Sequence, residues 1–284
     1  MNMASDNHSK ELDAGERFAF GENWAQFLNV LDEQRIKTAE DSLKNMLEVE
    51  DLNGRSFLDI GSGSGLFSLA AKRLGAKVFS FDYDPQSVAC TKELKKRYFD
   101  NDKDWLVESG SVLDTEYLKR LGEFDIVYSW GVLHHTGNMW AALNNVKGNV
   151  ANNGKLFIAL YNNQGGASKR WLTIKVIYNK LPKLLKIIFA FCIYLPLEIR
   201  SFLMHFIRGK PFVYFEYIKN YKNHSGRGMS WWHDKIDWIG GLPFEVSKPE
   251  EIFSFLRSNG FALCVLKTCA GGHGCNEYVF QRSD

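Results

Sequence analysis

The sequence has little of what marks a secreted or a membrane-spanning protein. It holds five cysteines among 284 residues, an odd number with no CxxC pair, and it begins with the polar stretch MNMASDNHSKELD rather than a secretory signal. We therefore expect free thiols, a reducing compartment and a cytoplasmic location. The longest apolar run, Ile187 to Leu197, contains Pro196. A transmembrane helix needs about 20 apolar residues, so we do not expect a span here.

The chain also lacks a large net charge, which is formally +2. The net charge by itself therefore predicts neither an acidic nor a basic binding partner. The charge is unevenly placed, however. Residues 169–222 contain eleven Lys or Arg and two acids, a net +9 that leaves −7 for the rest of the chain. The sequence therefore predicts an acidic body with one basic segment.

What the sequence does contain is an alternation of short apolar segments with helical ones. Strands are predicted at 56–60, 77–82, 105–110, 124–130 and 155–161, with helices between them at 66–74, 87–97, 115–122 and 139–150. This alternation indicates a parallel, doubly wound α/β sheet. Ahead of it we expect disorder over 1–15 and helices over 21–50.

The pattern stops after residue 162 and resumes near Ser247, where a capping box to Glu250 starts a helix predicted over 250–260. Two further strands, 261–268 and 277–282, are joined by seven or eight residues and should pair antiparallel. We predict three regions: a helical N-terminal segment or lid (1–54), a core (55–162 with 247–284) and a helical insertion (163–246).

The segment LDIGSGSG, residues 58–65, runs from a predicted strand into a predicted helix. Glycines there let the backbone turn tightly and approach a ligand, and the helix N-terminus offers unpaired N–H groups. The spacing differs from the G-x-G-x-x-G of dinucleotide sites, and Asp59 precedes the first glycine. A carboxylate repels a pyrophosphate but attracts an ammonium group. Asp82 ends the next strand, where an acid accepts hydrogen bonds from ribose hydroxyls. A ribose with an amino-acid end describes S-adenosylmethionine, although a ligand-free turn would have the same glycines.

Five segments in order resemble the motifs of class I S-adenosylmethionine-dependent methyltransferases. They are LDIGSGSG, FDYD (81–84), ESGSVLD (108–114), FDIVYSWGVLHHTG (124–137) and NGKLFIALYN (153–162). Within that class the sequence is similar to small-molecule O-methyltransferases of the ubiquinone-biosynthesis type. The resemblance implies a Rossmann-like, doubly wound seven-stranded sheet with an antiparallel last strand and a helical insertion after the fifth strand. It also implies S-adenosylmethionine as cofactor and S-adenosylhomocysteine as product.

The resemblance assigns roles around the cofactor. Gly61 and Gly63 back its methionine end, Asp59 lies by the ammonium group, Asp82 holds the ribose and Tyr83 lies against adenine. The remaining positions that the resemblance implies are Ser111, Val112, Trp130 and Gly131. Ser111 stands where the family commonly has an acid, so Asp114 or backbone groups alone are the alternatives for that adenine contact. Trp130 and Gly131 should face the methionine portion.

For the acceptor, two histidines follow the fourth predicted strand, at the sheet edge where ligands bind in such folds. We predict His134 and His135 as catalytic candidates, since imidazole can take a proton near neutral pH; the residues alone do not say which one acts. Acceptor-binding candidates are Tyr161, Trp231, Trp232, His233 and Asp234. The last four stand in an aromatic segment suited to a ring or a sugar, or equally to packing of the tryptophans in a core. No metal is expected, because Cys269, His273 and Cys275 lack zinc spacing.

The apolar, basic stretch 180–210 leaves three interpretations open: a lid, a homodimer interface, or a peripheral contact with an anionic membrane. We predict a methyltransferase for a small molecule, with O-methylation of a lipid-linked, quinone-like or sugar acceptor. An RNA methyltransferase and a non-catalytic scaffold that binds the cofactor are the alternatives. Nucleic acid is the less expected partner, because the basic stretch is strongly apolar.

Overall fold

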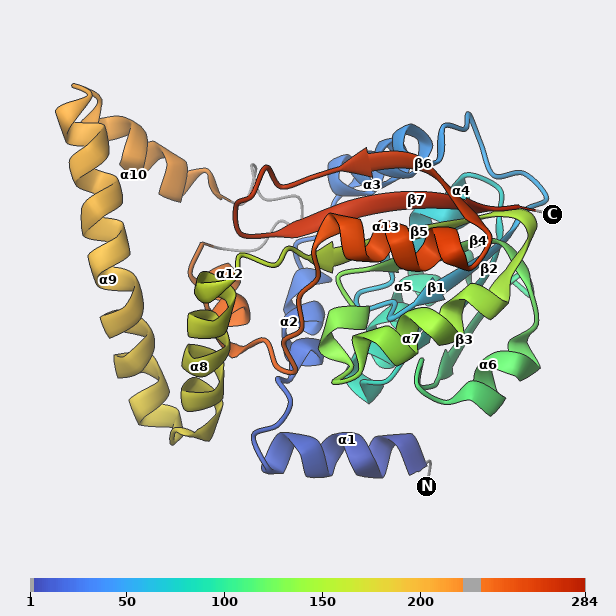
Figure 1. Cartoon of the computed structure of the whole chain (residues 1–284), viewed down its shortest axis with the longest axis horizontal. Helices are drawn as coiled ribbons and strands as arrows, with labels where there is room; N and C mark the ends of the chain where they lie inside the picture. The colour runs from blue at the N-terminus through green and yellow to red at the C-terminus, as the bar shows by residue number, and fades with distance from the viewer. Residues whose placement is uncertain (1–2, 222–230, 284) are drawn as a thin grey trace.

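Seven strands form a single sheet in the computed structural model, which describes residues 3–221 and 231–283 (Figure 1). The strands are β1 (Ser56–Ile60), β2 (Lys77–Asp82), β3 (Trp105–Ser109), β4 (Phe124–Trp130), β5 (Val150–Tyr161), β6 (Phe261–Lys267) and β7 (Cys275–Arg282). Their order across the sheet is β3-β2-β1-β4-β5-β7-β6. The first five strands are parallel, and β7 runs antiparallel between β5 and β6. The predicted fold class is therefore confirmed.

Helices cover both faces of the sheet, because its central strands are apolar on both sides. One buried cluster joins the sheet to α3 (Glu33–Leu47), α4 (Leu66–Arg73) and α5 (Pro85–Phe99). A second joins the other face to α6 (Thr115–Leu121), α7 (Met139–Val146) and α13 (Pro249–Ser258). Leu58 of β1 and Ile158 of β5 are fully buried in the second cluster. The loops at the carboxyl ends of β1, β2 and β4 are thereby fixed on a rigid base.

The N-terminal region differs from its prediction. The expectation of disorder over 1–15 is wrong for the described residues of this range, since α1 (Met3–Asp13) forms and is followed by α2 (Phe20–Phe27); residues 1 and 2 lie outside the described residues. The reason is tertiary: His8 is only 5% exposed and packs edge-on against Tyr83. Two smaller boundaries also shift. The strand β5 begins five residues earlier than predicted, and the cap of α13 is Lys248, paired with Glu251, rather than Ser247 with Glu250.

The insertion projects from one end of the sheet as a set of helices (Figure 1). These are α8 (Gly166–Lys180), α9 (Lys183–Ile207), α10 (Pro211–Lys219) and α12 (Trp231–Gly240). A third buried cluster, centred on Tyr178, Ala190, Tyr194 and Ile239, holds α8, α9 and α12 together.

The apolar run from Ile187 to Leu197 lies within a helix that is longer than the run itself. The helix α9 continues through Pro196 for 25 residues, and by length and composition alone it could cross a bilayer. In the most apolar part of this helix only 11% of the residues are buried.

Candidate active site

The glycine loop after β1 adopts a conformation that side chains rarely tolerate. Gly61 has φ +76° and Gly63 has φ +55°. A Cβ on Gly61 would lie 2.4 Å from the side chain of Val132, and one on Gly63 would lie 3.1 Å from the indole of Trp24. The positive φ angles and the close contacts explain why glycine stands at both positions.

Two carboxylates lie beside this loop, Asp59 buried and Asp82 half-buried. Asp59 is 2% exposed and accepts a hydrogen bond from the Ser68 hydroxyl, while Asp82 accepts one from the Gly63 amide at 2.9 Å. Burial, and the nearby charge of Asp82, raise the pKa of Asp59 to about 7. Burial raises the pKa of Asp82 to about 6. A ligand that brings an ammonium group and hydroxyl donors would offset the cost of ionising two carboxyls in this place.

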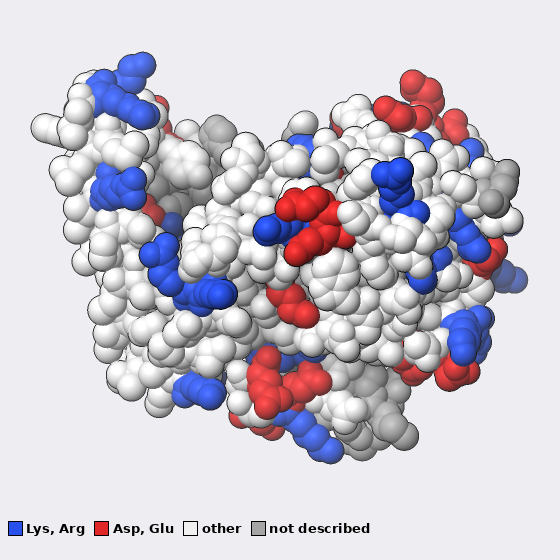
Figure 2. All heavy atoms as spheres, viewed as in Figure 1, with Lys and Arg blue, Asp and Glu red and all other residues white. Residues whose placement is uncertain are grey.

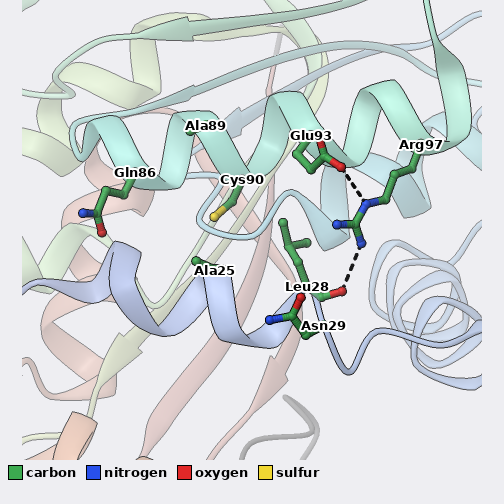
Figure 3. Close-up of a pocket in the computed structure, with 8 residues that line it drawn as sticks. All are labelled: Ala25, Leu28, Asn29, Gln86, Ala89, Cys90, Glu93 and Arg97. Carbon is green, nitrogen blue, oxygen red and sulfur yellow. Dashed lines mark hydrogen bonds and ion pairs between the residues drawn. The ribbon is translucent and has the colours of Figure 1, made fainter.

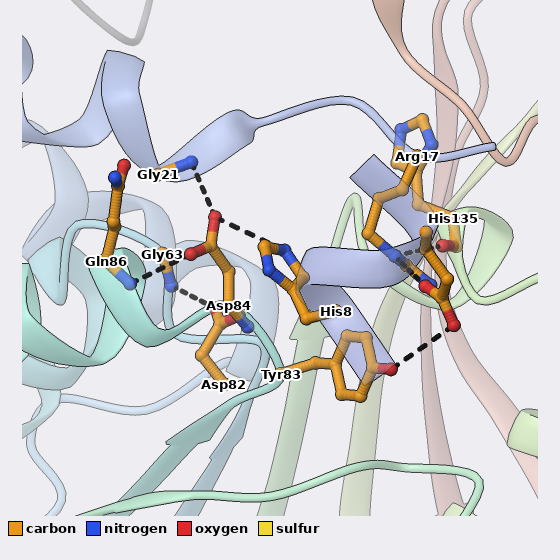
Figure 4. A network of polar contacts seen from close by, with 10 residues as sticks. His8, Arg17, Gly21, Gly63, Asp82, Tyr83, Asp84, Gln86 and His135 are labelled. Atoms are coloured by element: carbon orange, nitrogen blue, oxygen red, sulfur yellow. Dashed lines mark hydrogen bonds and ion pairs between the residues drawn. The ribbon is translucent and has the colours of Figure 1, made fainter. Parts of the chain in front are cut away.

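The N-terminal segment crosses over the ends of β1 and β2 (Figure 4). The Gly21 amide donates to Asp84 at 2.8 Å, and the His8 imidazole lies 3.8 Å from the same carboxylate. Burial lowers the pKa of His8 despite the opposing attraction of Asp84. Trp24 lies against the glycine loop. The segment predicted as a lid therefore does cover the candidate cofactor site in this structure.

Tyr83, predicted to face adenine, lies under this segment. The Arg17 guanidinium lies 4.8 Å from the centre of the Tyr83 ring, and the Tyr83 hydroxyl donates to Glu11 at 3.2 Å. Burial raises the pKa of Tyr83 to about 12. Arg17 also donates to the His135 carbonyl at 3.0 Å. One arginine thus connects the predicted cofactor side to the predicted catalytic side, a role that the sequence did not reveal.

The remaining predicted cofactor residues lie at the ends of β3 and β4. The Ser111 hydroxyl accepts from the Leu113 amide, and Val112 is buried. Asp114 caps α6 by accepting from the amides of Glu116 and Tyr117, so its carboxylate is already engaged. Backbone groups are then the better candidates for an adenine contact. Trp130 is the last residue of β4.

Gly131 follows Trp130 with φ +75°, and a Cβ placed on it would meet open space. Space beside Gly131, two glycines at positive φ and the carboxyls beside them fit S-adenosylmethionine, which would be held by Asp59, Gly61, Gly63, Asp82 and Gly131.

The two histidines form a short 3-10 helix after β4 and have different hydrogen bonds. His134 is fully buried; its Nδ1 accepts from the Tyr161 amide at 3.3 Å, and its ring lies on the Tyr161 ring with centroids 3.8 Å apart. In His135, Nδ1 lies 2.5 Å from the Pro243 carbonyl oxygen. A carbonyl only accepts, so Nδ1 of His135 carries the proton and Nε2 carries the lone pair. The same reasoning places the proton of neutral His134 on Nε2.

An aromatic cluster surrounds these histidines. Tyr161 contacts His135, Trp238 and Phe244 with ring centroids 5.3, 5.3 and 5.4 Å apart. Trp238 in turn contacts Trp171 and His273. The predicted Tyr161 is therefore at the centre of a ring-lined region beside His135.

Lys175 was not predicted from the sequence as a site residue, and it is fully buried in this cluster. Its Nζ donates to the Trp238 carbonyl and lies 4.6 Å from the centre of the Trp238 ring. Burial lowers the pKa of Lys175 to about 7, although Asp237 opposes the shift. Nothing in the sequence of α8 distinguishes this buried lysine from an exposed one.

The other predicted acceptor residues lie elsewhere on α12. Trp232 packs against Phe191 of α9, Trp231 lies under the Lys235 ammonium, and Asp234 accepts from the Tyr221 hydroxyl. The side chain of His233 lies outside the described residues. The structure thus brings Trp238, rather than Trp231, Trp232 or Asp234, to Tyr161, because one helical face of α12 turns toward the sheet and another toward α9.

A separate surface depression lies between α2 and α5 (Figure 3). Arg97 closes one end of it by pairing with Glu93 at 2.9 Å and donating to the Leu28 carbonyl at 3.0 Å. No predicted site residue lines this depression. It is therefore not the candidate active site, which lies at the carboxyl ends of the strands as expected for this topology.

This combination of sheet order, glycine loop and paired carboxyls defines a Rossmann-like protein of the methyltransferase type. Residues 31–186 match the family described as "Methyltransferase domain". The chain belongs to this family. The membership and the fold confirm the predicted family and support the predicted class of enzyme and its methyl donor.

Similar curated proteins match over short stretches. A ribosomal protein L11 methyltransferase from Vibrio parahaemolyticus is 44% identical over 52 residues, which is 18% of each chain. A ubiquinone biosynthesis O-methyltransferase from Pelagibacter ubique is 27% identical over 134 residues, or 47% of this chain and 50% of that protein. The chain thus spans half or less of the length of these relatives.

Solved structures share the fold over most of the chain. Magnesium protoporphyrin IX methyltransferase from Synechocystis, crystallised with bound S-adenosylhomocysteine, superposes with a TM-score of 0.51 at 13% identity, over 87% of this chain and 83% of that one. A methyltransferase-like protein from Listeria monocytogenes gives a TM-score of 0.50 at 14% identity, covering 87% and 99%. At this identity the similarity concerns the fold.

Proposed function

We propose that this protein transfers a methyl group from S-adenosylmethionine to a hydroxyl of a small aromatic or quinone-like acceptor. The observation that carries the proposal is the orientation of His135. Its Nδ1 faces the Pro243 carbonyl at 2.5 Å, which leaves the Nε2 lone pair to accept a proton, and Tyr161 packs edge-on against its ring.

The donor side is the glycine loop with Asp59 and Asp82. When bound, the cofactor supplies an electrophilic methyl group on its sulfonium. The protein's part is to hold donor and acceptor in line, since alignment alone contributes several kcal/mol to such reactions. The rigid turn at Gly61 and the fixed end of β4 provide that alignment.

The acceptor side favours a hydroxyl nucleophile. A hydroxyl must lose its proton as the new bond forms, whereas a neutral amine attacks first and loses its proton afterwards. Nε2 of His135 takes that proton, and the resulting imidazolium keeps its Nδ1–H bond to Pro243. Tyr161, Trp238 and Phe244 provide ring faces against which a flat acceptor stacks.

His134 has a supporting role in this proposal. Because its Nδ1 accepts from the Tyr161 amide, its Nε2 carries the proton and cannot take another while neutral. Its ring instead fixes the position of Tyr161. In this proposal, His135 is the base and His134 is a positioning residue.

The test uses methyl-labelled S-adenosylmethionine with a panel of phenols, catechols and hydroxylated quinones, each paired with its amine counterpart. We expect label in the hydroxyl compounds. Changing His135→Gln should lower kcat by about 100- to 10,000-fold while leaving S-adenosylhomocysteine binding unchanged. His134→Gln is the matched control, and its kcat should keep the pH dependence of the unaltered enzyme.

Undiminished kcat in His135→Gln would show that the acceptor needs no base here. Preferential labelling of the amines would contradict O-methylation but not methyl transfer. Label that enters an RNA fraction would favour the nucleic-acid alternative. Calorimetry that detects no binding of S-adenosylhomocysteine would favour a non-catalytic scaffold.

A further inference from the structure

The helices α9 and α10 expose an unusual amount of apolar surface. Along α9, residues spaced by three and four positions face outward and form what we call the outer apolar face: Leu184, Ile188, Phe191, Leu195 and Ile199. Their exposed fractions run from 49% to 74%. The face continues to the last residue of the helix, Ile207, which is 82% exposed, and on to Phe212 of α10, which is 77% exposed. A contiguous surface of this kind marks an interaction site.

The inner side of α9 is held by the protein itself. Ala190 and Tyr194 are buried, and the Tyr194 hydroxyl donates to the Lys235 carbonyl of α12 at 2.7 Å. Glu198 pairs with the Lys235 ammonium at 2.6 Å. These contacts hold the middle of α9 against α8 and α12, so the outer apolar face is presented by a folded helix rather than by a loose segment.

Basic residues stand at both ends of this face. Lys180, Lys183 and Lys186 lie around its beginning, and Arg200, Arg208 and Lys210 around its end. Between Lys183 and Lys210 the chain has one carboxylate, Glu198, which is already paired with Lys235. In Figure 2 the left margin of the molecule, over α9, is largely uncharged, with Lys and Arg near its upper and lower ends.

We propose that the outer apolar face docks on an anionic lipid bilayer, with α9 lying in the plane of the membrane surface. Apolar side chains would enter the boundary between headgroups and acyl chains, and the lysines and arginines would contact anionic headgroups. The charge pattern is complementary to such a surface at both ends of the helix. The docking requires no methyl donor, so it stands or fails independently of the proposed function.

A second copy of the chain fits this face less well. If two outer apolar faces paired in an antiparallel arrangement, the lysines near Lys183 would meet the partner's bases near Arg208. A parallel arrangement would place each basic end beside its own counterpart. Both arrangements bring like charges together without carboxylates between them, which opposes association. Anionic headgroups instead neutralise both ends.

The in-plane orientation follows from the contacts on the inner side. A spanning helix would have to leave α8 and α12, exposing Tyr194 and carrying Glu198, separated from Lys235, into the hydrocarbon region, where an ionised side chain is costly. An in-plane helix keeps the buried cluster around Tyr194 intact and immerses only side chains that are already exposed.

The test is flotation of the full-length chain with vesicles, either of phosphatidylcholine alone or of equal parts of phosphatidylcholine and phosphatidylglycerol. We expect flotation only with the anionic vesicles, and release from them by concentrated salt. The double change Ile188→Glu with Phe191→Glu should abolish flotation. Replacing Lys183 or Lys210 by Glu should weaken binding at least about five-fold each, since one basic residue near the surface contributes about that factor.

The matched control is Leu106→Glu on β3, because Leu106 is as exposed (50%) as Ile188 (54%) but lies outside the insertion. It should float like the unaltered protein. The proposal is overturned if the chain fails to float with anionic vesicles, or floats equally with neutral ones. It is also overturned if alkaline carbonate fails to release the protein, which would indicate a spanning helix. Sedimentation of a lipid-free dimer that the Ile188→Glu, Phe191→Glu variant dissociates would assign the face to a second copy instead.

Discussion

The sheet core and the helical insertion use apolar residues in opposite ways. In the core, Leu58 and Ile158 are fully buried between strands and helices. In the insertion, Ile188 and Ile207 are exposed although the surrounding sequence is at least as apolar. The comparison teaches that apolar content alone does not indicate the interior of this protein. An apolar residue of this chain is buried only where a neighbouring helix or strand covers it.

The same contrast separates the two halves of the candidate site. The donor half is built from glycines and carboxyls at the ends of sheet strands, which cannot move without disturbing the core. The acceptor half is built from rings contributed by β5, α8, α12 and the loop holding Phe244. The reaction we propose therefore occurs where a rigid donor site meets an assembled acceptor site.

The strongest test of this contrast compares two isoleucines. Ile158→Ala leaves a cavity in the sheet core and should lower the free energy of unfolding by about 2–5 kcal/mol. Ile188→Ala removes a side chain that is already exposed and should change it by about 0.5 kcal/mol or less. Chemical denaturation measures both. Similar losses of unfolding free energy in the two variants would mean that the outer apolar face is buried in solution.

The next largest effect is expected at the glycine loop. A Cβ on Gly61 would lie 2.4 Å from Val132, so Gly61→Ala should weaken S-adenosylhomocysteine binding by about 100-fold, as measured by calorimetry. Gly54→Ala is the control, since Gly54 has a similar φ of +74° but open space around its Cβ position. Gly54→Ala strains the backbone but should bind S-adenosylhomocysteine normally. Normal binding by Gly61→Ala would move the cofactor site away from this loop.

The paired carboxyls predict a pH dependence. Because the folded-state pKa values of Asp59 (about 7) and Asp82 (about 6) lie above the ordinary 3.8, the ligand-free protein should lose stability as pH rises from about 4 to 7. Asp59→Asn should flatten this loss and raise the thermal unfolding midpoint at neutral pH. The control is Glu123→Gln, an exposed acid outside the loop.

Binding should show the reverse dependence on pH. A ligand ammonium favours the ionised form of Asp59, so binding should release protons, and affinity for S-adenosylhomocysteine should fall by up to about tenfold per unit as pH drops below about 7. Calorimetry in buffers of different ionisation enthalpy measures the release. Proton uptake instead would contradict the assignment of Asp59 to the ammonium group.

The smallest expected effect concerns Lys175 in the acceptor half. Its folded-state pKa of about 7 lies below the ordinary 10.5, so the unfolded chain binds more protons between these values and stability should rise with pH above 7. In Lys175→Met, the rise of the free energy of unfolding between pH 7 and 9 should be smaller by about 1 kcal/mol per pH unit. Lys169→Met, an exposed lysine of the same helix, should leave the slope unchanged.

Much of the donor half could be predicted from the sequence, because its signals are local. The spacing of glycines after an apolar strand and the acid at the end of the next one are fixed by backbone geometry. The strands of the sheet were predicted with small boundary errors for the same reason. The helix α1 and the length of α9 were not, since the first depends on contacts of His8 with Tyr83 and Asp84, and the second runs through a proline.

The acceptor half depended on distant contacts. Trp231, Trp232 and Trp238 are equivalent in the sequence, and only the rotation of α12 against α8 brings Trp238 to Tyr161. The burial of Lys175, the bridge formed by Arg17 and the different roles of His134 and His135 likewise come from partners more than 20 residues away. By itself the sequence determined the fold and the glycine turn after β1, because strand periodicity and glycine conformations are properties of neighbouring residues. The tertiary structure decided which rings gather beside the two histidines and which hydrogen bond each imidazole makes, because those positions result from the packing of separate helices.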